Sequence, residues 1–131
     1  MIARRILNDE RGATVLEFAL ALPVLATLMI GILQFGIVMH TSGGIRHAMG
    51  EGLRYAKVNP SATAAQVEQH ARNALVGIDN GGLTAVSFTR GTQDGAEYGR
   101  LTISYRAEPV VPFIPDQVIN LSRTKQVYLP N

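Results

Sequence analysis

Residues 18–39, FALALPVLATLMIGILQFGIVM, contain no charged side chain over a run of 22 residues. A helix of this length reaches about 33 Å, close to the roughly 30 Å hydrocarbon core of a bilayer. No comparable apolar run follows Met39. The stretch therefore predicts a single membrane-spanning helix.

The composition fits a small anchored protein. The chain has 131 residues, enough for one domain beside the span, and only 17% of them are charged, against about 25% in globular chains. There is no cysteine, which excludes disulfides and zinc–thiolate sites. The basic residues form no face with interleaved aromatic residues, so nucleic-acid binding is not indicated.

Catalytic chemistry is not indicated either. The sequence has no G-x-S-x-G, phosphate-binding loop or zincin motif. His40 and His47 could share a helix face but have no third ligand at metal spacing, and His70 stands among polar neighbours. We therefore expect no enzyme, no catalytic, cofactor or metal site, and no small-molecule substrate.

The residues after the span predict a small α+β module. Helical spacing continues through residues 45–56 and extends the spanning helix as an amphipathic stem to about Lys57. Thr63 and Gln66 have the spacing of a capping box, which predicts a second helix to about Val76. Strand-like runs follow at residues 83–90, 100–108 and 120–129, with a glycine-rich loop over 91–99. The predicted fold is α+β: a long N-terminal transmembrane helix with an amphipathic stem, a second helix and a small three-stranded antiparallel sheet.

The N-terminus carries the most specific pattern. Residues 1–12, MIARRILNDERG, are short, polar and basic and end in glycine. The apolar run that follows is too long for a secretory signal peptide and lacks an A-x-A-like site just after it. Glu17 stands at the edge of the apolar helix, where an unpaired carboxylate is costly. It is either a boundary residue in the headgroup layer or a group that awaits a cation inside the bilayer.

The stretch RGATVLEFALALPVLATLMIGILQFG, residues 11–36, resembles a TadE-like minor pseudopilin of the Tad/Flp (type IVb) pilus system. The matching positions are Arg11, Gly12, Glu17, Phe18, Pro23, Gly31, Phe35 and Gly36. The resemblance covers residues 1–60 well, and beyond them it rests on the order of the elements. The long region after the helix distinguishes the chain from a short Flp major pilin.

The resemblance implies a processing and docking site. A prepilin peptidase would cut between Gly12 and Ala13, and Glu17 with Phe18 would dock against a neighbouring subunit. The freed amine of Ala13 would be mostly cationic at neutral pH, because an α-amine titrates at about 7.7–8.0. In a medium of low dielectric constant, the attraction between such an amine and a carboxylate can offset much of the free-energy cost of desolvating both groups. A single unpaired group has no such compensation.

The resemblance also implies a location and partners. Residues 1–12 would be a cytoplasmic leader, residues 13–57 the transmembrane helix and stem, and residues 58–131 a small extracytoplasmic α+β domain. Basic residues flank the span almost equally, so charge alone does not orient it. The resemblance places the protein in the bacterial cytoplasmic (inner) membrane as a single-pass protein, with its C-terminal domain outside. The expected partners are the membrane, a prepilin peptidase and other pilin-like subunits of an adhesion pilus.

Two features inside the helix can each be interpreted in two ways. Pro23 removes a backbone donor and either bends the helix for assembly or is an ordinary membrane-helix proline. Small residues at four-residue spacing either let another helix approach closely or merely loosen the helix. These residues are Thr27 and Gly31, then Gly44, Ala48, Gly52 and Ala56.

Two questions about the domain stay open as well. The proline-punctuated apolar segment 109–115 either touches a partner or the membrane, or folds over the edge of the sheet. The alternative to the pilus function is an uncleaved signal-anchored module, in which the domain binds an envelope ligand and the helix is only a tether.

Overall fold

The computed structural model describes residues 10–110, 112 and 117–130. Helix α2 spans Glu10–Val58 and helix α3 spans Ala64–Asn73, followed by the short 3-10 helix η1, Asn80–Gly82. Strands β1 (Leu83–Gln93), β2 (Ala96–Ala107) and β3 (Ile119–Tyr128) complete the chain. The predicted α+β fold is confirmed. Most of the predicted leader and much of segment 109–115 lie outside the described residues.

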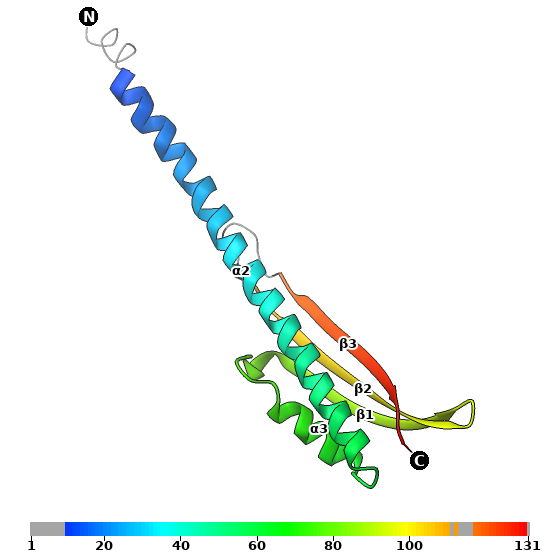
Figure 1. Ribbon diagram of the computed structural model, residues 1–131. Helices are drawn as coiled ribbons and strands as arrows, with labels where there is room; N and C mark the ends of the chain where they lie inside the picture. Colours follow the sequence, from blue (N-terminus) through cyan, green and yellow to red (C-terminus); the bar gives the residue numbers. More distant parts are fainter. Residues whose placement is uncertain (1–9, 111, 113–116, 131) are drawn as a thin grey trace, which may run out of the picture.

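Helix α2 dominates the shape of the molecule. It has 49 residues, which corresponds to about 74 Å, and it continues without a break through Pro23. Its C-terminal half lies along the sheet, whereas its N-terminal half projects beyond the rest of the protein (Figure 1). The stem ends at Val58, one residue past the predicted end.

The three strands form an antiparallel meander in the order β1-β2-β3. In the register of the sheet, Leu101 of β2 lies between Phe88 of β1 and Lys125 of β3. The predicted loop over 91–99 is wrong, because β1 and β2 continue to a turn of two residues, Asp94 and Gly95. Both have positive φ, 54° and 78°, the geometry of the type I′ turn that matches the twist of paired strands.

Helix α3 begins at the predicted capping box and is shorter than predicted. The amide of Gln66 donates to Thr63 Oγ1 over 3.3 Å, and the amide of Thr63 donates to Gln66 Oε1 over 2.9 Å. Such caps contribute about 1 kcal/mol. The helix ends at Asn73 rather than near Val76, and the chain then turns through Gly77 with φ of 74°.

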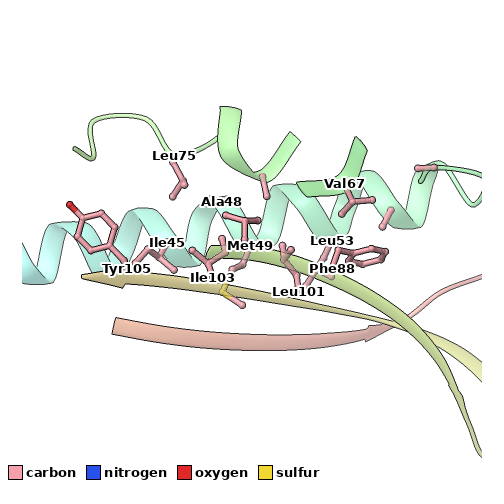
Figure 2. Packing of buried hydrophobic residues seen from close by; sticks show 14 of the residues in the cluster. Ile45, Ala48, Met49, Leu53, Val67, Leu75, Phe88, Leu101, Ile103 and Tyr105 are labelled. Carbon is pink, nitrogen blue, oxygen red and sulfur yellow. The ribbon is translucent and has the colours of Figure 1, made fainter. Parts of the chain in front are cut away.

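The hydrophobic core lies where α2, α3 and the inner face of the sheet meet (Figure 2). Helix α2 contributes Ile45, Met49 and Leu53 at helical spacing, and Leu101 and Ile103 oppose them from β2. The core also contains Ala48, Ala56, Ala62, Val67, Ala71, Leu75, Val86, Phe88, Tyr105 and Leu129. The C-terminal half of α2 is therefore packed into the core, and its first buried residue is Thr41.

Two side chains tie β1 to the helical layer. Glu68 Oε1 of α3 accepts a hydrogen bond from the backbone amide of Phe88 over 2.8 Å. Arg90 Nη2 donates to the carbonyl of Ala62 over 2.9 Å. These contacts orient the sheet against α3 and hold the inner face of β1 over the core.

Candidate functional site

The N-terminal half of α2 is the largest exposed apolar surface among the described residues. Most of its apolar side chains are exposed, with Phe18 65% and Leu33 66% exposed, whereas Ile30 and Val38 are half-buried. It is the one described helix that is long and apolar enough to cross a membrane. Such a surface is far larger than the apolar patches of soluble monomers. It requires lipid or other apolar helices around it.

The predicted processing and docking residues lie near the start of this surface. Gly12 and Ala13 are the third and fourth residues of α2. Glu17 follows Ala13 by four residues, so the two stand on the same side of the helix, one turn apart. Glu17 and Phe18 are both exposed.

Glu17 is electrostatically isolated. It is the only residue with a formal charge from Gly12 to Ile45. Within the described part of the chain, no ion pair or hydrogen bond involves its carboxylate. In the described residues, Glu17 is thus an unpaired carboxylate on a long apolar helix. A cation from outside the chain could neutralise its charge.

Pro23 and Thr27 form a small local unit on the exposed helix. The hydroxyl of Thr27 donates to the carbonyl of Pro23 over 2.8 Å. This bond hides the hydroxyl from an apolar environment, as threonine commonly does in helices. A shallow apolar hollow is lined by Pro23, Val24, Thr27 and Leu28. The predicted bend at Pro23 stays a prediction.

The predicted small residues fall into two groups with different surroundings. Near Gly31 a methyl group would meet nothing within 4 Å, so this part of the helix is open. At Gly52 a methyl carbon would stand 2.9 Å from Ala71 Cβ and 2.9 Å from Leu101 Cδ2. Ala48 and Ala56 are fully buried, and Gly44 faces Ile78. The second group is thus packed against other residues of the same chain, in α3, in the sheet and in the segment between them, and of the predicted small residues only Thr27 and Gly31 remain accessible to another helix.

His70 and Tyr105 are the remaining side chains with chemically notable surroundings. His70 stacks on Tyr55 with ring centroids 4.6 Å apart, a contact that the sequence analysis missed. Burial, and secondarily the charge of Asp79, raises the pKa of Tyr105 above its ordinary value. No group of three metal-ligating side chains occurs in the described ranges. None of these contacts arranges a nucleophile, a base and an electrophile together.

A protein-family model matches most of helix α2. The family model described as TadE-like protein matches residues 12–54, about a third of the chain. The matched segment begins at Gly12, contains Glu17, Phe18 and Pro23, and ends in the last turns of α2. No curated protein and no solved structure matches the chain.

Proposed function

From the TadE-like segment at residues 12–54, we propose that this pilus-related, membrane-anchored protein is a minor pseudopilin of a Tad/Flp adhesion pilus. A prepilin peptidase cuts it after Gly12 in the bacterial cytoplasmic membrane, with its C-terminal domain outside, and it either acts there or is incorporated in the pilus. Its role is structural: its helix packs with the helices of other pilin-like subunits. The observation that carries the proposal is the unpaired Glu17, one turn after Ala13 on an exposed apolar helix.

Cleavage would create the cation that Glu17 lacks. The new amine of Ala13 is mostly protonated at neutral pH. The carboxylate of Glu17 stands one turn along the helix from this amine, or about 6 Å. A neighbouring helix shifted by one turn therefore brings its amine to the level of Glu17. Breaking a buried ion pair by removing one partner costs roughly 3–5 kcal/mol, because the other charge is left unpaired.

The surroundings of the helix favour assembly with other helices. The surface around Glu17 and Phe18 carries no contact with the protein's own domain, whose packing begins at Thr41. The hollow at Pro23 and Thr27 and the open side of Gly31 allow another helix to approach closely. These features are expected of a helix that exchanges lipid contacts for helix contacts.

The mature N-terminus is the first test. The full chain is coexpressed with a prepilin peptidase and its intact mass is measured, with a Gly12→Leu variant as the uncut control. The proposal expects a chain that begins at Ala13 and a control that keeps Met1. An intact Met1 on the unaltered chain would overturn the processing step.

Variants at Glu17 test the docking role. Glu17→Gln and Glu17→Ala keep membrane insertion, because they remove a charge from an apolar helix, and they abolish piliation in a strain that depends on this protein. Glu51→Ala is the matched control, since Glu51 is a carboxylate on the same helix in a surface ion pair with Arg54. Normal piliation with Glu17→Ala would rule out the docking role.

A helix exchange separates this function from a simple tether. Residues 1–40 are replaced by an unrelated membrane anchor, a junction that leaves the buried Thr41 and everything after it unchanged. Lost piliation with a folded domain supports the helix as an assembly element. Retained function would instead support the signal-anchored binding module.

A further inference from the structure

The membrane-side end of the sheet reaches back along the spanning helix. A cleft of about 750 Å³ separates α2 from this end of the domain. On the helix side it is lined by Gln34, Ile37 and Val38, and on the other side by the end of β2 from Tyr105 and by Pro109. Residues 34–38 belong to the uncharged run that begins at Phe18. The end of β2 therefore lies beside the last part of the uncharged run, and Ile119 at the start of β3 pairs with Ala107 next to it (Figure 1).

The described ends of this connection are apolar and exposed. Val110 is 74% exposed, and Val118 and Ile119 are 42% and 38% exposed. Ile37 on α2, which lines the cleft, is also exposed. Exposed apolar side chains therefore occur both on the spanning helix and at the adjoining end of the domain.

The thickness of a bilayer sets the depth of this region. If the carboxylate of Glu17 marks one boundary, a hydrocarbon core of about 30 Å takes about 20 residues of helix. The count from Phe18 ends at Ile37, which is the level where the end of β2 lies beside α2. The count does not use the position of the domain, so the agreement is independent support for a membrane boundary at this level.

We propose that Val110, Val118 and Ile119 insert into the outer boundary of the lipid bilayer, so that the sheet rests on the membrane beside its own anchor. The occupant of this surface is lipid. Irregular backbone cannot lie in the hydrocarbon core without partners, so Val110 and Val118, which lie outside the strands, sit at the acyl–headgroup boundary and not deeper. Arg106 and Glu108, which form an exposed ion pair of 2.9 Å at the end of β2, lie at headgroup level. This proposal requires the membrane anchor but neither cleavage nor a pilus.

Tryptophan probes test the contact directly, because the chain contains no tryptophan. The full chain with Val110→Trp is reconstituted into phosphatidylcholine vesicles whose acyl chains are brominated at defined depths. Thr92→Trp is the matched control, since Thr92 is exposed near the β1–β2 turn, at the opposite end of the sheet. The proposal expects bromine quenching and blue-shifted emission for Val110→Trp, strongest for bromines near the headgroup, and neither effect for Thr92→Trp.

Two results would overturn the proposal. Emission of Val110→Trp that matches the control would place the residue in water. Blue-shifted emission without bromine quenching would show that protein, and not lipid, covers the site. Circular dichroism checks that the variant is folded. If Val110→Trp does not fold, Val118→Trp is used for the same fluorescence measurement. Adding Glu17→Ala leaves the quenching unchanged, so failure of the pilus function and failure of this contact are distinguishable.

Discussion

The two halves of α2 belong to one continuous helix but differ in composition and in surroundings. From Gly12 to His40 the helix is apolar on all sides and almost every side chain is exposed. From Thr41 to Val58 one face is buried in the core and the other carries charges such as Arg46 and Arg54. A helix that is apolar all round requires lipid or other helices, whereas an amphipathic helix packs on one layer. The comparison shows that one continuous helix serves first as an anchor and then as the central element of the domain.

The small residues show the same division. Gly31 and Gly52 are both helical glycines, and each has a small residue four positions before it, Thr27 and Ala48. Around Gly52 the space that a side chain would fill is taken by Ala71 and Leu101. Around Gly31 it is empty. In the C-terminal half of the helix, the pair of small residues is therefore packed against other residues of the same chain. In the N-terminal half, no side chain of the described part of the chain packs at Gly31.

The two halves of α2 should differ most in how strongly a leucine-to-alanine substitution lowers the free energy of unfolding. Leu53 is 2% exposed in the core and Leu33 is 66% exposed on the anchor. Leu53→Ala should lower the free energy of unfolding by roughly 2–5 kcal/mol, because it removes buried methyl groups and leaves a cavity. Leu33→Ala should leave it almost unchanged. Denaturant unfolding of the detergent-solubilised protein measures both, and equal losses would contradict the division of the helix.

Substitutions of Gly52 and Gly31 should give a smaller difference in the free energy of unfolding between the two halves. Gly52→Val should destabilise the domain by about 1–3 kcal/mol, because its side chain would overlap Ala71 and Leu101. Gly31→Val makes the same chemical change where nothing stands within 4 Å. The same unfolding measurement is expected to show no loss there. A tolerated Gly52→Val would mean that α3 and the sheet do not pack on α2 as closely as described.

The smallest effect concerns Tyr105, near the end of β2, at high pH. The pKa of Tyr105 is raised in the folded protein from its ordinary value of 10.0. The folded state therefore favours the neutral phenol, and this contribution is complete below pH 10.0 and is lost as pH rises through the folded-state pKa. Thermal unfolding from pH 8 to 11 should show an alkaline loss of stability that is smaller in Tyr105→Phe. Tyr128→Phe, at an exposed tyrosine, controls for removal of a hydroxyl, and identical pH profiles for all three proteins would exclude the effect.

Local patterns were enough to predict much of the fold. The uncharged run predicted the long helix, because only a continuous helix satisfies its backbone without outside partners. The Thr63–Gln66 spacing predicted the start of α3, because a capping box is made within four residues. The run at residues 100–108 predicted strand β2, in which Leu101, Ile103 and Tyr105 alternate with polar residues and form the buried face.

The failures occurred where a local pattern allowed two outcomes. The polar, glycine-rich residues 91–99 suggested a loop, yet Asp94-Gly95 is also the residue pair of a two-residue hairpin, and pairing extends both strands to it. The turn itself was the signal that could have predicted this. The stacking of Tyr55 on His70 joins residues 15 positions apart in sequence, across the end of α2 and the face of α3. No periodicity in the sequence indicates such a contact.

The sequence by itself determined the anchor, the isolated acid at its edge and the order of helices and strands, because hydropathy, charge and backbone capping act over a few neighbouring residues. Only the tertiary structure decided that the second half of the helix is part of the core of the domain, that its small residues already have partners, and that the end of β2 lies at the level of Ile37. These properties depend on contacts between residues that are distant along the chain. A stretch of sequence states which surfaces are apolar, but it does not state which of them the rest of the chain will cover.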